Sequence, residues 1–133
     1  MIDVNNLYEW CSIPASELLH HPKRKVPLRI VEDATALGQI MARDLIDEIK
    51  LANAEKRTFR VIVPCGPKEW YAPFANMVNA ERVDLSNVVC FHMDENLDWE
   101  AKLLPENDPG NFKSFMHRYF YEAIQPELRV KEE

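Results

Sequence analysis

Glycine is scarce in this chain of 133 residues, which contains three glycines, Gly38, Gly66 and Gly110. The G-x-G-x-x-G turn that binds dinucleotides and the Walker A loop that binds nucleoside triphosphates both need glycines at a closer, fixed spacing. Both motifs are therefore excluded. The shortage also singles out Gly66, because it directly follows an apolar run of strand length.

Cysteine is equally sparse, with Cys11, Cys65 and Cys90 widely spaced and no Cys-x-x-Cys pair. An odd, scattered set argues against a disulfide framework or a zinc site and favours a reducing compartment. The N-terminus lacks the basic start and apolar core of a signal peptide. No apolar run approaches membrane-spanning length. We therefore expect a cytoplasmic protein that does not bind membranes.

Positive charge is also in deficit, with 16 lysines and arginines against 22 acidic residues and a net charge of −6. Non-specific binding to nucleic acid is not expected from such a chain. The length fits one domain. We expect residues 1–25 to form an N-terminal extension with a short helical piece and a basic linker, and residues 26–133 to form an α/β domain.

Apolar runs alternate with helical patterns through that domain. Strands are expected at 26–31, 59–63 and 88–92. Helices are expected from the acidic pair Glu32-Asp33 to about residue 54, over about 68–79, and along an aromatic stripe from Phe112 to Phe120. This order predicts a doubly wound, mostly parallel sheet. Residues 126–133 are expected to be a frayed, charged tail.

Three short strands are few for such a sheet, because parallel sheets need both faces covered and open edges are hazardous. We therefore expect either additional chain beyond these residues or a partner, such as a second copy in a homo-oligomer, to cover the exposed edge of the sheet.

Residues 88–96 carry the clearest functional signal, because a strand-length apolar run ends in two carboxylates, Asp94 and Glu95. Ligands of open α/β sheets bind beyond the carboxyl ends of the strands. Neighbouring side chains on a strand point to opposite faces. One carboxylate is therefore expected to act on a substrate, while the other holds a helix N-terminus or a basic side chain. The alternative is an ordinary acidic loop.

The turn Cys65-Gly66-Pro67-Lys68 follows the preceding strand and leads into a helix, where free backbone N–H groups can bind an anion. Gly66 allows a tight turn or the close approach of a ligand, and Lys68 offers a positive charge. Glu69 opposes this prediction. The alternative is a structural turn with Pro67 near the first helical position. Both loops are expected to leave the same edge of the sheet.

Other candidate groups are weaker. Cys65 at a helix start resembles a nucleophile, but no histidine is adjacent in sequence, and we favour a half-buried structural cysteine. His92 with Asp94 and Asp98 has the chemistry of a divalent metal site, but we favour a packed or exposed histidine and predict no metal. Trp70, Tyr71 and the Phe112–Phe120 stripe are expected to form the core rather than a stacking platform.

Two segments together resemble the N-terminal half of the glucosamine-6-phosphate deaminase/isomerase family, whose relatives include the 6-phosphogluconolactonases. They are Phe91-His92-Met93-Asp94-Glu95 and Ser114-Phe115-Met116-His117-Arg118, followed by Phe120. The resemblance covers roughly residues 26–125. It implies a partial Rossmann-like sheet and a phosphorylated sugar as the substrate, and it implies no cofactor.

The resemblance also implies roles for individual residues. Asp94 takes the place of the base that moves a proton between C1 and C2 of the opened sugar, with Glu95 orienting the site. The phosphate falls on the turn formed by Cys65, Gly66, Pro67 and Lys68.

The sequence departs from the family in three places. The family's phosphate loop, Ser/Thr-Gly-Gly-Thr/Ser-Pro, is replaced by the turn from Cys65 to Glu69, and Asn96 replaces a tyrosine. The family's second half, with its Asp-Gly-His ring-opening segment, is missing. We therefore expect an N-terminal segment of a longer protein, or a truncated one. The alternatives are a 6-phosphogluconolactonase-like hydrolase, which Met93 and the Ser114-to-Arg118 helix disfavour, and a non-catalytic sugar-phosphate-binding module.

Overall fold

The computed structural model describes residues 3–131, and the chain divides into two compact units on either side of the bond between Glu32 and Asp33. The first unit contains α1, Val4–Cys11, and a 3-10 helix, Ala15–His20. Asp3 caps α1 by accepting a hydrogen bond from the Asn5 N–H at 2.9 Å. The helix expected in the extension is thus present. None of the described residues of this unit is fully buried.

The strand predicted at residues 26–31 is not formed, and this prediction is wrong. Val26, Leu28 and Ile30 are exposed. Pro27 removes one N–H donor from a short run, and the two strands among the described residues pair with each other. A β-branched run becomes a strand only where a neighbouring backbone completes its hydrogen bonds.

The second unit begins with α2, Ala34–Ala54, which Asp33 caps by accepting from the Ala36 N–H at 2.7 Å. Its buried positions recur at helical spacing and are mostly small or β-branched: Gly38, Ala42, Ile46, Ile49 and Ala52. The predicted helix is confirmed. The fully buried residues of α2 are not all large apolar ones. Leu37, a large apolar residue at helical spacing, is exposed.

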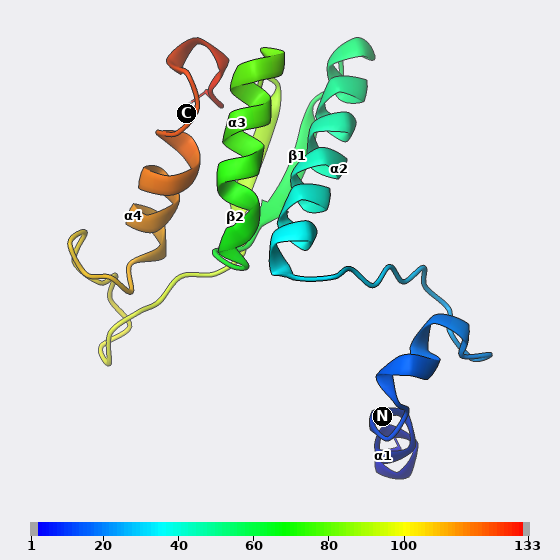
Figure 1. Ribbon diagram of the computed structural model, residues 1–133. Coiled ribbons are helices and arrows are strands. Elements are labelled where there is room, and N and C mark those ends of the chain that lie inside the picture. Colours follow the sequence, from blue (N-terminus) through cyan, green and yellow to red (C-terminus); the bar gives the residue numbers. More distant parts are fainter. Residues whose placement is uncertain (1–2, 132–133) are drawn as a thin grey trace. The chain divides into compact units, whose positions relative to one another are not determined.

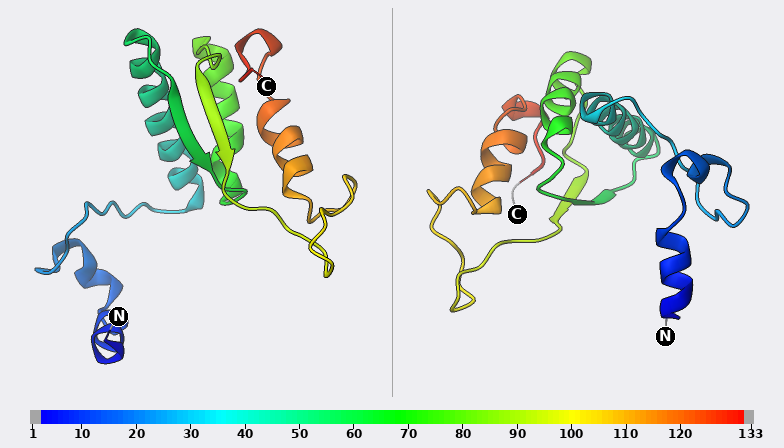
Figure 2. Two further views of the ribbon diagram at one scale, coloured as in Figure 1. Left: turned by 180° about the vertical axis from the view of Figure 1, so that it is seen from behind. Right: turned by 60° about the horizontal axis from the view of Figure 1, so that its bottom comes forward.

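Two parallel strands form the sheet: β1, Phe59–Val63, and β2, Val88–His92. A 3-10 turn, Lys68–Trp70, and α3, Tyr71–Glu81, connect them. Figures 1 and 2 show α2 and α3 lying on the same face of the two strands. The predicted α/β class, a parallel sheet with flanking helices, is confirmed, with two strands in place of three.

The opposite face of this sheet carries exposed apolar side chains. Ile62 is 63% exposed and Phe91 is 53% exposed. Seen from behind in Figure 2, no helix of the second unit's described residues covers this face. This open apolar face is a feature that the sequence pattern did not indicate.

The core lies between the strands, α3 and the last helical segment, which consists of α4, Phe112–Met116, and a π-helical turn, His117–Tyr121. Phe74 and Phe120 stack with ring centroids 5.3 Å apart, and Trp70 lies 5.4 Å from Phe120. All three rings are at most 2% exposed. The expectation that these aromatic residues form the core is confirmed.

The charged tail is packed rather than frayed, so that prediction is wrong for residues 126–131. A 3-10 helix, Pro126–Leu128, places Leu128 in the core at 5% exposure. The Leu85 N–H donates to the Leu128 carbonyl at 3.0 Å. Arg129 adds a hydrogen bond from its Nε–H to the Ile124 carbonyl at 2.8 Å, so apolar packing and polar contacts together anchor the segment. Residues 132–133 lie outside the described residues.

Candidate active site

Both loops singled out in the sequence leave the same edge of the sheet. The register pairs Val63 with His92, the last residues of β1 and β2. The Met93 N–H donates to the Val63 carbonyl at 3.0 Å and so carries the ladder one step further. The turn after β1 and the acidic pair after β2 therefore start side by side, at the position where open α/β sheets bind ligands.

Asp94 is exposed at this edge, and no hydrogen bond engages its carboxylate among residues 3–131. Its charge reaches the neighbouring turn. Burial raises the pKa of the Cys65 thiol, the charges of Asp94 and Glu95 raise it further, and Lys68 opposes them. Cys65 is therefore held as a thiol, which does not favour a nucleophilic role. Asp94 remains the carboxylate that is available to a ligand.

Glu95 is engaged at the N-terminus of α4. Its two carboxylate oxygens accept hydrogen bonds from the N–H groups of Phe112 at 2.7 Å and Lys113 at 2.8 Å. Asn111, the N-cap residue, accepts from the Ser114 N–H at 2.7 Å. Of the two roles that the sequence leaves open for the acidic pair, Glu95 therefore fills that of holding a helix N-terminus.

The electrostatics of Glu95 agree with this role. Desolvation raises the pKa of its carboxyl, but the backbone N–H donors of Phe112, Lys113 and Asn96, assisted by His92, outweigh it and lower the pKa overall. A carboxylate that accepts several backbone donors is fixed in its charged form. Glu95 thus joins the end of β2 to the start of α4 and sets the path of the chain around Asp94.

Gly66 in the turn after β1 does not have a positive φ, so the tight-turn explanation for a glycine there does not apply. A Cβ atom built on Gly66 would meet nothing within 4 Å. The other sequence interpretation, that a ligand approaches the backbone here, remains compatible with this open space. Pro67 directly precedes the 3-10 turn, close to the helix-start position expected of it.

Lys68 is exposed and turns toward the last helical segment. Its Nζ atom lies 4.8 Å from the centroid of the Phe115 ring, within cation–π range. It also lies near enough to the turn to lower the pKa of Cys65. The structure therefore places Lys68 at the border between the Cys65–Asp94 edge and the surface formed with α4.

Two tyrosines to which the sequence analysis assigned no role at the site bond to the ends of the two strands. Tyr71 donates a hydrogen bond to the Pro64 carbonyl at 2.7 Å, and the Tyr121 hydroxyl lies 2.9 Å from His92 Nε2. Burial lowers the pKa of His92, His117 lowers it further, and Glu95 opposes them. The sequence does contain an indication of this role, because a tyrosine in an apolar helix needs a hydrogen-bond partner for its hydroxyl.

A metal-ligand cluster and a membrane-spanning helix are both absent from the described residues. Within residues 3–131, no three histidine, cysteine or acidic side chains come together as metal ligands, so His92, Asp94 and Asp98 do not form such a group. Over the same residues, no helix is both long enough and apolar enough to cross a bilayer.

Comparison with curated proteins identifies a relative. The chain is 33% identical over 104 residues to the glucosamine-6-phosphate deaminase of Aeromonas hydrophila subsp. hydrophila, an alignment covering 76% of this chain. The chain belongs to the glucosamine-6-phosphate deaminase family. It spans 36% of the length of that relative. No model of a known protein family matches the chain.

Among solved structures, this family member superimposes on a chain described as a monomeric glucosamine-6-phosphate deaminase, a "missing link of the NagB superfamily". The TM-score is 0.59 with 22% identity, and the match covers 74% of this chain and 39% of the other. At this identity the likeness shows a common fold. The Rossmann-like arrangement expected from the sequence is thereby shown for the deaminase-family chain.

The capping role of Glu95 leads to a first prediction. Glu95→Gln is expected to lower the free energy of unfolding at pH 7 by about 1 kcal/mol, because a neutral amide oxygen replaces a charged cap. Since folding lowers the pKa of Glu95, its contribution is full above the unfolded pKa, near ~4.3. It is lost as the pH falls through the folded value. Urea unfolding at pH 7 and in acid measures both effects.

Glu100→Gln is the matched control, because Glu100 lies in the same connection and pairs with Lys102 at 2.5 Å on the surface. An exposed pair of this kind contributes about 0–1 kcal/mol. If Glu95→Gln is as stable as the unsubstituted protein at pH 7, the capping role is contradicted.

Proposed function

We propose that the edge formed by residues 64–68 and 93–95 is the proton-transfer part of a glucosamine-6-phosphate deaminase/isomerase-type site. The observation that carries the proposal is the contrast between the two adjacent carboxylates. Glu95 is committed to the backbone of α4, whereas Asp94 is exposed and has no hydrogen-bond partner among the described residues. A general base needs a carboxylate oxygen that is free to reach the proton of a bound substrate.

Asp94 acts on the opened amino sugar phosphate. It takes the proton from C2, and the electron pair of that C–H bond forms a C1–C2 double bond while the C1 oxygen takes a proton from solvent. Asp94 then returns its proton to C1, which keeps its hydroxyl group, while the C2 nitrogen gives up a proton to solvent and a C2 imine forms. Water adds to this imine, ammonia leaves, and the ketose phosphate remains. The proposal assigns proton transfer and phosphate binding to this chain, and ring opening requires a further acid–base group.

The phosphate is bound at the turn after β1. Backbone N–H groups at a strand-to-helix turn suit an anion, Gly66 leaves open space beside the backbone, and Lys68 brings the positive charge. The partial match to the family's phosphate loop, in which one glycine and the hydroxyl residues are replaced, makes binding at this turn the step to test first.

The direct experiment supplies glucosamine 6-phosphate to the protein and follows binding by titration calorimetry and turnover by ammonia release. Ammonia release supports the deaminase assignment. Lactone hydrolysis without ammonia release would instead indicate a 6-phosphogluconolactonase-like hydrolase. Binding without either reaction would indicate a sugar-phosphate-binding module.

A second prediction concerns Gly66→Ala. Because a Cβ atom at this position meets no neighbour within 4 Å and φ is not positive, the substitution is expected to change the free energy of unfolding by less than about 0.5 kcal/mol. The added methyl group does occupy the space assigned to the phosphate. The affinity for glucosamine 6-phosphate is therefore expected to fall about tenfold or more.

The same titration made with Gly110→Ala is the control, since Gly110 lies at the start of the last helical segment. If Gly66→Ala binds glucosamine 6-phosphate with undiminished affinity, the phosphate is not bound at this turn. The role of Asp94 is tested separately, by the variant Asp94→Asn.

A further inference from the structure

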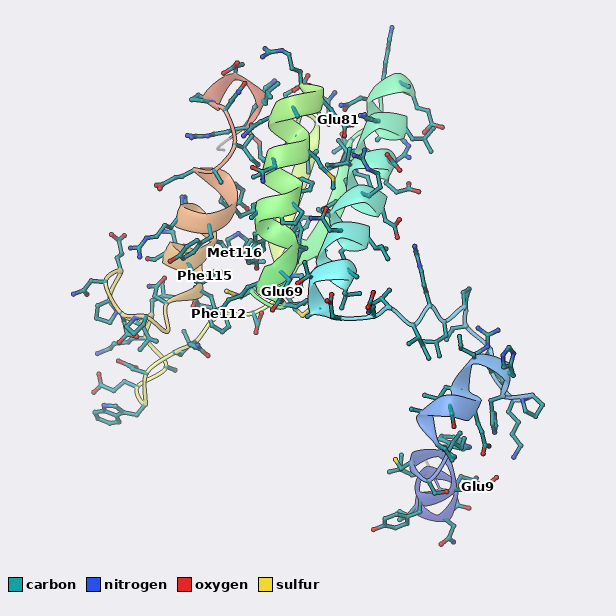
Figure 3. The ribbon with its side chains drawn as sticks, in the orientation of Figure 1. Glu9, Glu69, Glu81, Phe112, Phe115 and Met116 are labelled. Carbon is teal, nitrogen blue, oxygen red and sulfur yellow. The ribbon has the colours of Figure 1, made fainter. Side chains whose placement is uncertain are left out.

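A cleft of about 480 Å³ opens between α3 and the last helical segment, beyond the edge that carries Asp94. Its lining comes from the 3-10 turn, α3 and residues 115–123: Lys68, Tyr71, Ala72, Ala75, Asn76, Phe115, Arg118, Tyr119 and Ala123. Figure 3 shows Phe115 and Met116 where α4 approaches α3. Neither Cys65 nor Asp94 belongs to the lining, and Lys68 is the one residue that the cleft shares with the proposed catalytic edge.

The lining of the cleft is positively charged, whereas the chain as a whole is negatively charged. The chain has a net charge of −6, yet this lining contains two cations, Lys68 and Arg118, and among the described residues no acidic side chain contributes to it. Within residues 3–131, no hydrogen bond or ion pair engages Arg118. A local excess of unpaired positive charge in an acidic protein selects an anion.

The walls of the cleft are apolar and partly aromatic. Tyr71 and Phe115 lie with ring centroids 5.8 Å apart, and the small side chains of Ala72 and Ala75 leave room beside them. The volume lies in the range of small-ligand pockets, which combine apolar walls with a few placed polar groups. Such walls favour a ligand that brings a ring as well as a charge.

A second hollow nearby differs from this cleft in both its charge and its walls. It is lined by Lys113, Ser114, His117 and Arg118, but also by Glu106 and Glu122. Its acidic residues balance its lysine and arginine, and no phenylalanine, tyrosine or tryptophan lines it. Arg118 lines both surfaces, and of the two linings the one between α3 and the last helical segment is the one with aromatic residues and without acidic ones.

We propose that this cleft is a second binding site, for a small anion that carries a planar ring. The ring lies against Ala72 and Phe115, and a phosphate or carboxylate group is bound by Arg118 with help from Lys68. Asn76 offers a neutral hydrogen-bonding group on α3. The site differs from the catalytic edge in its walls and in its ligand, since a sugar phosphate has no flat apolar face of this kind.

Phenyl phosphate is the probe, because it joins a planar ring to a phosphate. Titration calorimetry compares it with inorganic phosphate, which lacks the ring, and with phenol, which lacks the charge. Phenyl phosphate is expected to bind at least tenfold more tightly than either, and to shift the amide resonances of Ala72, Asn76 and Phe115. Inorganic phosphate binding as tightly as phenyl phosphate would overturn the proposal.

Two variants leave Lys68 untouched, because that residue is shared with the phosphate turn. Arg118→Gln removes a charged donor, and Ala72→Leu fills the cleft from an exposed helical position. Each is expected to weaken phenyl phosphate binding about tenfold. Arg60→Gln, on an exposed arginine of β1 outside the cleft, is expected to have no effect. If Gly66→Ala weakens binding while Arg118→Gln does not, the probe occupies the substrate turn and the proposal is wrong.

Discussion

Asp94→Asn is expected to lower the rate of ammonia release from glucosamine 6-phosphate about 10²- to 10⁴-fold, the usual contribution of a positioned general base. Asparagine has almost the same size and shape, but its amide does not accept a proton at neutral pH. Because Asp94 is exposed and no hydrogen bond among the described residues holds it, the substitution should leave the fold and the affinity for the sugar phosphate nearly unchanged. The loss should therefore appear in kcat rather than in KM.

Exchange of substrate hydrogen with solvent deuterium isolates the step assigned to Asp94. Deuterium incorporation at C1 of fructose 6-phosphate in the presence of ammonium follows proton transfer and does not depend on complete turnover. It should fall as steeply as ammonia release. Glu100→Gln, on an exposed carboxylate of the same connection, should leave both rates intact. Normal exchange and turnover by Asp94→Asn would exclude this residue as the base.

The strands at 59–63 and 88–92 were predictable from the sequence because local features bound them. Pro64 closes the first run, and the acidic pair that begins at Asp94 follows the second. The run at 26–31 is also rich in β-branched residues, but it contains Pro27 and lacks a neighbouring strand among the described residues, and pairing is not a local property. The packing of the tail could not be predicted for a related reason. The Leu128 carbonyl accepts a hydrogen bond from the N–H of Leu85, which is distant in the sequence.

The candidate site was predictable to the same extent. That Cys65 and Asp94 leave one edge follows from the parallel order of the strands, which the sequence pattern indicates. That Glu95 rather than Asp94 caps α4 depends on contacts with Phe112 and Lys113, 17 and 18 residues further along the chain. The intervening loop has no repeating pattern from which such contacts could be predicted. The direction of Lys68 toward Phe115 depends on packing in the same way.

The glycines show this limit most clearly. Gly66 stood out because it follows a strand, yet a Cβ atom there meets nothing within 4 Å. Gly38 lies unmarked inside a helical pattern, yet α2 passes so close to the turn before α3 at this position that only hydrogen fits. The sequence indicates where glycine is unusual, whereas the tertiary contact decides where it is required.

Gly38→Ala is accordingly expected to have a large effect on stability. An added Cβ atom would lie 2.4 Å from the carbonyl oxygen of Glu69 and 2.5 Å from its carbonyl carbon. Both atoms belong to the backbone and cannot rotate away. Alanine favours a helix over glycine by about 1 kcal/mol, but overpacking costs about 1–3 kcal/mol, and more where backbones must separate. A net loss of unfolding free energy of about 1–2 kcal/mol is expected.

The strain should also reach the site. Glu69 directly follows Lys68 in the 3-10 turn that begins α3, so pushing this carbonyl away from α2 displaces the turn that starts at Cys65. The affinity for glucosamine 6-phosphate should fall together with stability, although Gly38 touches no part of the proposed site. Gly110→Ala is the control, because its Cβ atom would meet the side chains of Asp108 and Leu104 at 3.2 Å, and side chains can move aside. If Gly38→Ala unfolds at the same urea concentration as the unsubstituted protein, α2 and the turn before α3 are not in the close contact that the site depends on.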